Sequence, residues 1–419
     1  MNQKFLIEGG KPLFGEVEIS GSKNEAGAIL AATILAKGYC EIDNLPKITD
    51  ILDQIEILKK MGAKVEWIGE RKIRVFTENI DPEKIPFDLF EKMRISVLFF
   101  GPLLARFSKI KVPRPGGDRI GLRPISTHLE AFKELGVKIS QKNDFYILEA
   151  PKKLKKRKIV LKEFSVTATE NLMLFFAKKE GKFQIEIAAA EPHCQNLGKF
   201  LEKMGAKIEG LGTHSVKIEG KKELSGRDFS ISPDPIETGT FLIAFATTQG
   251  EGLIKTKNFE SLTFFLEKMR EIGVKFKLQK EGIFIKKSQN FKATKIQTLP
   301  HPGFPTDLQP QTCVLLTQAK GKSLIHETLY ENRFQHLHEL RKMGADIEIT
   351  DPHRALIFGK TPLFGTKVNS SDIRSGASLV LAGLVAKGQT IVENIEQIDR
   401  GYEKIEEKLK KLGAKIERV

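Results

Sequence analysis

Six basic residues lie where the sequence predicts the start of a helix. A helix N-terminus carries partial positive charge and unpaired N–H groups, so acidic or hydroxyl side chains are expected there and Lys or Arg is disfavoured. Recurrence of cations at this position predicts that helix dipoles and side chains together bind anions. The six residues are Lys23, Arg94, Arg123, Arg333, Arg374 and Arg400.

Each of these cations could instead pair with a nearby carboxylate. Asp372 lies two residues before Arg374, and Asp399 directly precedes Arg400. Such pairs are common on protein surfaces and need no ligand. Residue by residue the sequence leaves both interpretations open, whereas the set as a whole favours an anion-binding cleft.

Two carboxylates in loops rich in Pro and Gly are candidates for proton transfer. Asp118 lies in residues 113–121 and Asp307 ends residues 301–307. Loops of this composition can bring backbone N–H groups close to a ligand. The arginines around Asp118 keep it ionised unless an anionic ligand neutralises them. The alternatives are that Asp118 stabilises a glycine turn and that Asp307 caps the next helix.

The elements that must position these residues repeat along the chain. A helix end, a glycine and an alternating strand, as in LKKMGAKVEW from Leu58, recur six times at intervals of about 70 residues. A helix of small apolar residues followed by a strand interleaves with this pattern. Each glycine is predicted to cap a helix C-terminus in the left-handed conformation. These glycines are Gly62, Gly136, Gly205, Gly273, Gly344 and Gly413.

Length and composition are those of a globular protein with two domains. The chain has 419 residues, 40% hydrophobic and 29% charged, which is enough for two cores. No segment approaches the roughly 18 uninterrupted apolar residues of a membrane span. We therefore expect a cytoplasmic protein that does not bind a membrane.

Cysteine spacing indicates no metal site or disulfide, and the net charge indicates anionic partners. Cys40, Cys194 and Cys313 are far apart and are predicted to be buried small hydrophobes. The net charge of +15 suits anionic substrates, with nucleic acid as the rival partner. The basic run at 152–158 is predicted to be a solvated face, and no recognised nucleic-acid motif is present.

Several motifs together resemble the enolpyruvyl transferases, and within them the branch that acts on UDP-N-acetylglucosamine. The resemblance extends from Gly9 to the C-terminus. The motifs are ISGSKN at 19–24, MR at 93–94, PGG at 115–117 through RP at 123–124, ATEN at 168–171, IETGT at 236–240, PHP at 300–302 through Asp307, ENRF at 331–334 and IDRGY at 398–402. Enzymes of the sister branch, which make 5-enolpyruvylshikimate 3-phosphate, share the repeats but have a serine-rich phosphate loop.

The resemblance implies an inside-out α/β barrel-like fold with two domains of three repeats each. One domain would span 22–230 and carry the nucleotide side and the mobile Gly-Gly loop, and the other would combine 1–21 with 231–419. The active site would lie in a cleft that closes when substrate binds.

The reaction implied is transfer of the enolpyruvyl group of phosphoenolpyruvate to the 3′-hydroxyl of UDP-N-acetylglucosamine, with release of phosphate. This is the first committed step of peptidoglycan synthesis. It needs no metal and no organic cofactor. The resemblance does not indicate an oligomeric state.

The resemblance also implies a role for each site residue. Asp118 would be the general acid and Asp307 the base or orienting group for the sugar hydroxyl. The cations would divide between the phosphate (Lys23, Arg123, Arg400) and the carboxylate (Arg333, Arg374) of phosphoenolpyruvate, with Arg94 supporting Arg123 and the diphosphate. The remaining substrate-binding residues would be Ser165, Val166 and Thr167 at the diphosphate, Arg123, Pro124, Ile125, Ser126 and Thr127 at the uracil, and Asn24 and Leu329.

The chain departs from the family at a few of these positions. Most members have cysteine where this chain has Asp118, and the epoxide antibiotic fosfomycin alkylates that thiolate; a carboxylate is a poorer nucleophile, so we expect resistance. Ser126, Ala190 and Pro235 replace an aspartate, an arginine and an arginine. These changes leave three alternatives: another UDP-sugar as acceptor, the shikimate-pathway transferase, and a non-catalytic binding protein.

Overall fold

The computed structural model describes residues 3–117, 120–122, 124–257 and 259–419. They form two compact units, each with its own hydrophobic core. The N-terminal unit contains 21–117 and 124–232, and the C-terminal unit contains 3–20, 120–122, 233–257 and 259–419.

All six glycines predicted as helix C-caps have φ between 92° and 122°. Glycine is the residue that adopts such values without steric cost, so the prediction from the repeat is confirmed. The helices that precede these glycines are α2 (Thr49–Lys60), α5 (Ser126–Glu134), α7 (Pro192–Met204), α9 (Thr263–Ile272), α11 (Gln335–Lys342) and α14 (Ile405–Lys411). The strands that follow are β5 (Lys64–Trp67), β8 (Lys138–Lys142), β12 (Lys207–Glu209), β17 (Lys275–Gln279), β21 (Asp346–Asp351) and β25 (Lys415–Arg418).

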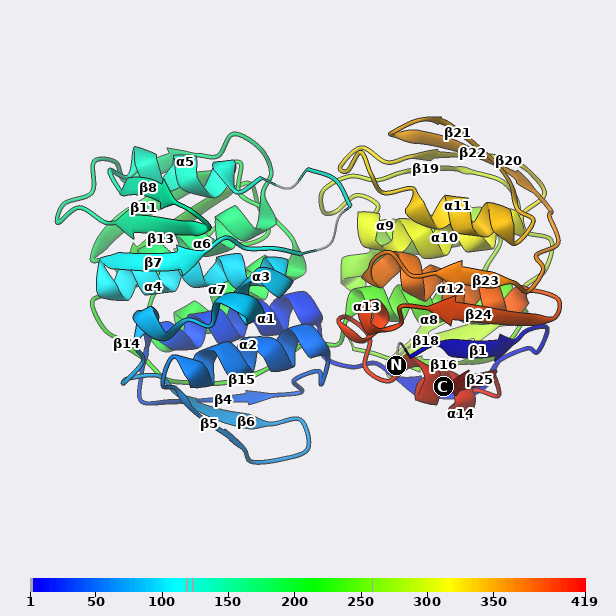
Figure 1. The fold of residues 1–419 in the computed structure, drawn as a ribbon, viewed down its shortest axis with the longest axis horizontal. Coiled ribbons are helices and arrows are strands. Elements are labelled where there is room, and N and C mark those ends of the chain that lie inside the picture. Colours follow the sequence, from blue (N-terminus) through cyan, green and yellow to red (C-terminus); the bar gives the residue numbers. More distant parts are fainter. Residues whose placement is uncertain (1–2, 118–119, 123, 258) are drawn as a thin grey trace. The chain divides into compact units, whose positions relative to one another are not determined.

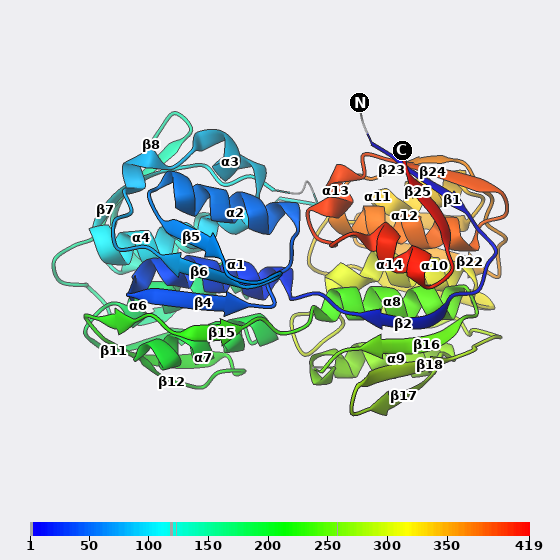
Figure 2. The same ribbon diagram turned by 90° about the horizontal axis from the view of Figure 1, so that it is seen from below.

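A second set of helices forms the interior of each unit. These helices are buried almost all round, and every residue of α10 is buried although two are glutamine and two threonine. They are α1 (Lys23–Ala32), α4 (Phe100–Phe107), α6 (Val166–Ala177), α8 (Pro235–Thr247), α10 (Gln309–Thr317) and α12 (Ile373–Val385). In each unit the helices lie in the middle and the sheets outside (Figures 1 and 2). The expected inside-out α/β fold is therefore confirmed.

Six sheets surround these helices. In the N-terminal unit their orders are β15 (Asp228–Ser230)-β4 (Tyr39–Asp43)-β6 (Ile73–Phe76)-β5, β7 (Lys109–Pro113)-β9 (Phe145–Glu149)-β8, and β10 (Lys158–Val160)-β11 (Gly181–Glu186)-β13 (Ser215–Gly220)-β12. In the C-terminal unit they are β17-β18 (Gly282–Lys286)-β16 (Glu251–Lys255)-β2 (Phe14–Glu18), β19 (Lys295–Gln297)-β20 (Gly321–His326)-β22 (Arg354–Gly359)-β21, and β23 (Lys367–Asn369)-β24 (Gln389–Glu393)-β1 (Phe5–Glu8)-β25. A short pair joins β3 (Ala36–Lys37) to β14 (Leu224–Ser225).

The shorter helical elements connect these parts. They are η1 (Thr33–Leu35), η2 (Pro82–Lys84), α3 (Phe87–Lys92), η3 (Arg94–Phe99), η4 (Glu260–Leu262), η5 (Thr306–Leu308) and α13 (Glu396–Asp399).

Two edge strands are exchanged between the units. Strand β2 precedes α1 in the chain but pairs in parallel with β16, and β15 precedes α8 but pairs in parallel with β4. The chain therefore passes from one unit to the other directly after β2, at residues 20–21, and again after β15, at residues 232–233. At these crossings the Ser22 N–H donates to the Ser232 carbonyl and the Asp234 N–H donates to the Ser20 carbonyl, both at 2.8 Å.

Gly21 lies at the first crossing, where the backbone passes close to Asn44. A Cβ atom at Gly21 would lie 1.9 Å from the Asn44 carbonyl oxygen. Any side chain there would displace the turn that begins α1. Glycine at this position therefore positions the neighbouring Ser22 and Lys23.

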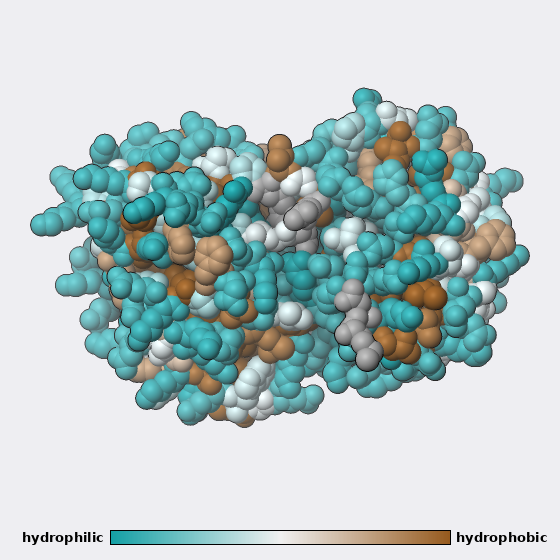
Figure 3. Space-filling view, in the orientation of Figure 1, coloured by the Kyte–Doolittle hydropathy of each residue, from teal (hydrophilic) through white to brown (hydrophobic). Residues whose placement is uncertain are grey.

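Hydrophilic side chains predominate on the face shown in Figure 3, where apolar residues form small groups. Within the described ranges, the longest apolar helices are too short to cross a membrane.

Candidate active site

The predicted site residues fall into two groups, one in each unit. The N-terminal unit holds Lys23, Asn24, Arg94, Pro124, Ile125, Ser126, Thr127, Ser165, Val166 and Thr167, and the C-terminal unit holds Asp307, Leu329, Arg333, Arg374 and Arg400. Asp118 and Arg123 lie outside the described residues.

Lys23 is the first residue of α1. The Ser22 hydroxyl caps this helix by accepting from the Glu25 N–H at 3.5 Å. The Lys23 Nζ lies 2.9 Å from the carboxylate of Asp50, whose side chain is 4% exposed. An ammonium group has three N–H donors, so this ion pair fixes the direction of Lys23 and is compatible with a bound anion.

Close helix packing places the Lys23 turn beside Arg94. A Cβ atom at Gly27 would lie 1.8 Å from the Ile95 Cδ1, so α1 and η3 approach each other more closely than any other residue would permit. Gly27 lies one turn after Lys23 and Asn24, and Ile95 follows Arg94. The repeat thus brings two of the predicted helix-start cations into one region of the N-terminal unit.

Three hydrogen bonds bring the predicted nucleotide-binding segments together. The Arg94 Nη2 donates to the Pro124 carbonyl at 3.0 Å. The Thr127 hydroxyl donates to the Glu163 Oε1 at 2.5 Å, and the His128 Nε2 lies 3.0 Å from the Thr167 Oγ1. Residue 94, residues 124–127 and residues 165–167 are therefore neighbours, although up to 73 positions separate them in the sequence.

Thr127 and Glu130 have the spacing of a capping box, but Thr127 is not the N-cap of α5. The N-cap is Ile125, which makes no side-chain cap hydrogen bond. Thr127 lies inside the helix and its hydroxyl is bound to Glu163. A hydroxyl caps a helix from the N-cap position, and Thr127 lies two residues beyond it.

His128 is a residue of this region that the sequence did not single out. Its Nδ1 lies 3.1 Å from the Asn171 Nδ2, which also donates to the Val97 carbonyl. The Asn171 amide is thus the donor and Nδ1 the acceptor, which leaves the hydrogen on Nε2 facing Thr167. Burial, with a further effect of the Arg94 charge, lowers the pKa of His128 to about 3. The imidazole is therefore neutral and holds the start of α6 in place.

Asp307 is bound by two arginines in the C-terminal unit. The Arg333 Nη2 donates to Oδ1 at 2.9 Å and the Arg374 Nε donates to Oδ2 at 3.1 Å. The arginine side chains are 2% and 5% exposed, whereas that of Asp307 is 30% exposed. The Arg333 Nη1 also lies 4.0 Å from the Asp372 carboxylate, and guanidinium groups held in this way suit an anionic ligand.

The structure shows which of Asp307 and Asp372 caps a helix. Asp307 lies within η5, whose N-cap is Pro305, so the helix-cap interpretation of Asp307 is wrong. Asp372 is the residue that caps a helix, because its Oδ1 accepts from the N–H groups of Arg374 and Ser375 at 2.9 and 3.1 Å. The side chain of Arg374 binds Asp307 and not Asp372, since the cap geometry uses the Asp372 oxygen for backbone donors.

Asp399 has a partner other than the one that adjacency suggested. Its two oxygens accept from Nη1 and Nη2 of Arg418 at 2.8 and 2.7 Å. The Arg400 Nη1 donates to the Gln397 Oε1 at 2.9 Å. Neighbouring residues at a helix end point in different directions, so sequence adjacency does not bring their charged ends together.

Tyr402 and Glu327, to which the sequence assigned no role, support the two arginines and Asp307. The Arg374 guanidinium lies 5.2 Å from the ring centroid of Tyr402, whose hydroxyl is hydrogen-bonded to Thr240 and Gln311. Burial lowers the pKa of Arg374, but the interactions with Tyr402 and Asp307 raise it by more than this. The guanidinium therefore stays charged.

The Glu327 carboxylate lies under the loop that carries Asp307. It accepts from the hydroxyls of Thr298 and Thr306 at 2.9 and 2.8 Å and from the Leu329 N–H at 3.0 Å. Thr306 precedes Asp307 directly. Glu327 therefore fixes the backbone beside Asp307 and the predicted contact residue Leu329.

The end of the Gly-Gly loop is attached close to Arg333. The Leu122 N–H donates to the Glu331 Oε1 at 2.6 Å, and the Asn332 N–H donates to the Ile120 carbonyl at 3.3 Å. The hydrogen bond from Leu122 lowers the pKa of Glu331. Residues 120–122, which follow the candidate acid in the sequence, are thus held next to residues 331–332.

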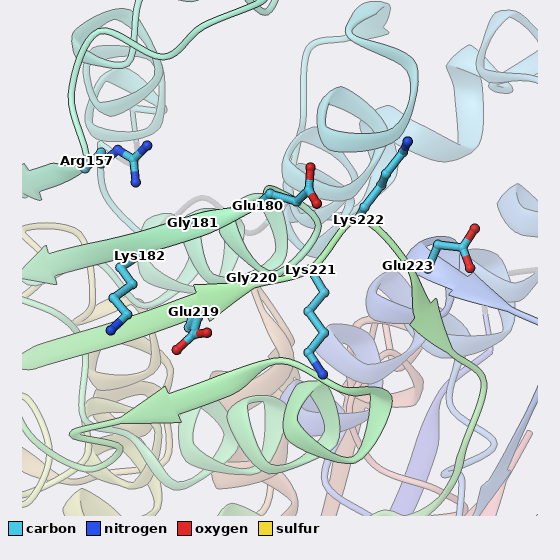
Figure 4. Close-up of a pocket in the computed structure, with 9 residues that line it drawn as sticks. All are labelled: Arg157, Glu180, Gly181, Lys182, Glu219, Gly220, Lys221, Lys222 and Glu223. Atoms are coloured by element: carbon cyan, nitrogen blue, oxygen red, sulfur yellow. The ribbon is translucent and has the colours of Figure 1, made fainter.

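A surface pocket in the N-terminal unit lies apart from these groups. Its charged side chains come from β11, β13 and the segments next to them (Figure 4). It is lined by Arg157, Glu180, Gly181, Lys182, Glu219, Gly220, Lys221, Lys222 and Glu223. Both signs of charge are present, and in the adjoining basic run Lys156 and Lys158 pair with Glu134 and Glu186 at 2.9 and 3.0 Å. The prediction of a solvated face is confirmed.

One protein family matches this chain over nearly its whole length. A family model for EPSP synthase (3-phosphoshikimate 1-carboxyvinyltransferase) matches residues 7–409. The chain belongs to this family and is therefore a transferase of the carboxyvinyl class.

The similar proteins include UDP-N-acetylglucosamine 1-carboxyvinyltransferase 1 of Caldanaerobacter subterraneus subsp. tengcongensis, 44% identical over 419 residues and 100% of both chains. The UDP-N-acetylglucosamine 1-carboxyvinyltransferase of Halothermothrix orenii is 45% identical over 417 residues and 99% of each chain. These relatives support the resemblance seen in the sequence.

Solved structures share the fold at lower sequence identity. The enolpyruvyl transferase NikO from Streptomyces tendae has a TM-score of 0.90 and 23% identity, covering 100% of this chain and 99% of its own. EPSP synthase from Acinetobacter baumannii has a TM-score of 0.73 and 17% identity over 100% of both chains.

Proposed function

We propose that this chain transfers the enolpyruvyl group of phosphoenolpyruvate to the 3′-hydroxyl of UDP-N-acetylglucosamine and releases phosphate, as the first committed step of peptidoglycan synthesis. The observation that carries the proposal is the full-length similarity to relatives that bear this activity in their names. The two groups of site residues supply the chemistry that the reaction needs.

The Asp307 group is assigned the carboxylate of phosphoenolpyruvate and the sugar hydroxyl. Arg333 and Arg374 both reach Asp307, so a substrate carboxylate at this place meets two guanidinium groups with a geometry suited to bidentate binding. The Asp307 carboxylate, held by the same arginines, accepts the proton of the attacking hydroxyl. Asp118 is assigned the general acid.

The proposed reaction has two steps, addition of the sugar hydroxyl to phosphoenolpyruvate and loss of phosphate. Asp118 protonates the methylene carbon of phosphoenolpyruvate while the 3′-oxygen bonds to its C2 and loses its proton to Asp307. The resulting ketal then loses phosphate: the bond from C2 to the phosphate oxygen breaks, the phosphate takes the proton held by Asp307, and a proton of the methyl group returns to Asp118 as the double bond re-forms. Lys23, Arg123 and Arg400 stabilise the departing phosphate.

The segments gathered around His128 are assigned the nucleotide. Ser165 caps α6 by accepting from the Ala168 N–H at 3.4 Å, and the N-terminus of α6 with Val166 and Thr167 is assigned the diphosphate. Arg94, joined to the Pro124 carbonyl, adds positive charge, and residues 123–127 are assigned the uracil.

Product analysis tests the proposal. Purified protein is incubated with phosphoenolpyruvate and either UDP-N-acetylglucosamine or shikimate 3-phosphate, and the products are identified by mass spectrometry. The expected product is the enolpyruvyl ether of the UDP-sugar, whereas 5-enolpyruvylshikimate 3-phosphate alone would overturn the assignment.

A further inference from the structure

A cluster of three different metal-binding side chains lies in the N-terminal unit between α6 and α7. Glu170 belongs to α6, and His193 and Cys194 follow Pro192 in the first turn of α7. One ligand atom from each side chain lies within 4.8 Å of the other two. Nothing in the proposed reaction uses these three groups.

The distances are close to those of a tetrahedral site. The Glu170 Oε1 lies 3.9 Å from the His193 Nε2 and 3.7 Å from the Cys194 Sγ. Around a tetrahedral Zn²⁺ with its usual bond lengths, such pairs are separated by about 3.3 and 3.5 Å. Both distances from Glu170 are therefore within a few tenths of an ångström of coordination, and the His193 and Cys194 ligand atoms lie within 4.8 Å of each other.

The charges of the cluster also favour a divalent cation. The side chain of Glu170 is 2% exposed, and among the described residues no lysine or arginine pairs with it. One divalent ion with a carboxylate, a thiolate and a neutral imidazole is electroneutral, which removes the cost of burying the two anions.

We infer that Glu170, His193 and Cys194 form a binding site for Zn²⁺ or a similar divalent transition metal. The mixed oxygen, nitrogen and sulfur donors suit a borderline-soft ion and do not suit Mg²⁺ or Ca²⁺. Binding releases the thiol proton, and the carboxyl proton if Glu170 holds one, to the buffer. The fourth position is open to water.

The site has an entry path and a structural consequence. His193 is 16% exposed, so an ion can reach the cluster from the side of this ring. The start of α7 disfavours a cation through its helix dipole, and the Glu191 carboxylate offsets that effect. A bound ion joins α6 to α7 one turn beyond the end of α6 that carries Ser165, so it stabilises this part of the unit.

Cobalt binding tests the inference without an activity assay. Protein freed of metal with a chelator and kept reduced is titrated with Co²⁺ and then with Zn²⁺. The expected result is one Co²⁺ per chain, with a thiolate-to-cobalt charge-transfer absorption that Zn²⁺ abolishes. His193→Gln and Cys194→Ser are expected to weaken binding at least about tenfold, and Cys194→Ser also removes the thiolate band.

Cys313→Ser is the matched control, because Cys313 is equally buried but belongs to the C-terminal unit. It is expected to leave Co²⁺ binding unchanged. His193 is partly exposed, so His193→Gln remains informative even if Cys194→Ser does not fold. Absence of a charge-transfer band in the wild type, or a band that both ligand variants retain, would overturn the inference.

Discussion

The Asp307 Oδ2 accepts a hydrogen bond from the Arg374 Nε at 3.1 Å, although 67 positions separate the two residues in the chain. The second oxygen of Asp307 is bound by Arg333. One carboxylate therefore orients two buried guanidinium groups. Guanidinium groups oriented in this way suit bidentate binding of a substrate carboxylate.

This arrangement predicts that Arg374→Lys weakens binding of phosphoenolpyruvate. A lysine ammonium lacks the planar fork that serves Asp307 and a substrate carboxylate together. The KM for phosphoenolpyruvate is expected to rise at least roughly tenfold, as for loss of one hydrogen bond between charged groups. The KM for the UDP-sugar is expected to change little.

Arg418→Lys is the control for that variant. Arg418 binds Asp399 and Glu406 in the same unit and has no assigned substrate. Steady-state kinetics give the KM of both variants for each substrate. An equal rise in KM for both substrates in Arg374→Lys would contradict the assignment of Arg374 to phosphoenolpyruvate.

The aspartate at position 118, where most family members have cysteine, predicts that fosfomycin does not modify the protein. A carboxylate opens an epoxide far more slowly than a thiolate. Intact-mass spectrometry of the wild type after incubation is expected to show no adduct, and Asp118→Cys is expected to gain one equivalent. An adduct on the wild type at residue 118 would sink the prediction.

Gly21→Ala tests the close backbone approach at the first crossing between the units. The new Cβ atom would lie 1.9 Å from the Asn44 carbonyl oxygen, so the backbone must shift. We expect a loss of about 1–3 kcal/mol in the free energy of unfolding. Gly69→Ala is the control, since its Cβ atom would meet only the Lys72 side chain at 3.3 Å among its close neighbours. Equal unfolding midpoints for the two variants would disagree with this account.

Two buried histidines predict a pH-dependent stability. Burial, with the nearby charge of Arg94 or Arg333, lowers the pKa of His128 and of His336 to about 3. Unfolded histidine titrates near about 6.5, so between these values the unfolded chain binds protons that the folded chain does not. The stability present above this window is therefore lost as the pH falls below about 6.5, at up to about 1.4 kcal/mol per pH unit for each histidine.

Denaturant unfolding between about pH 7 and pH 5 measures this slope. His336→Leu is expected to reduce it by the contribution of one histidine, whatever the variant does to absolute stability. The exposed His338 lies on the same helix, and His338→Leu is expected to leave the slope almost unchanged. Identical slopes in the wild type and His336→Leu would rule out this explanation.

The fold could be predicted from the sequence because its signals are local and repeated. A glycine that ends a helix acts through its own backbone, and all six glycines that the sequence indicates adopt positive φ. No local signal of this kind shows which strands β2 and β15 pair with. Strand pairing between β2 and β16 depends on residues more than 200 positions apart, and neither strand encodes its partner.

The site was predictable in its residue types but not in its pairings. The chain order places Asp372 and Asp399 beside arginines, yet their partners are a backbone turn and Arg418. Glu170 and Cys194 lie 24 positions apart, so cysteine spacing alone gave no sign of the cluster with His193. Side-chain direction at a helix end decides such contacts, and sequence spacing does not record it.

Phosphate release from phosphoenolpyruvate tests the central claim most directly. It is measured with and without UDP-N-acetylglucosamine for the wild type, Asp118→Asn and Asp307→Asn. The account predicts release that requires the UDP-sugar and a kcat at least about 100-fold lower in each variant, as for loss of an acid or base. Absence of release by the wild type in the presence of the UDP-sugar would contradict it.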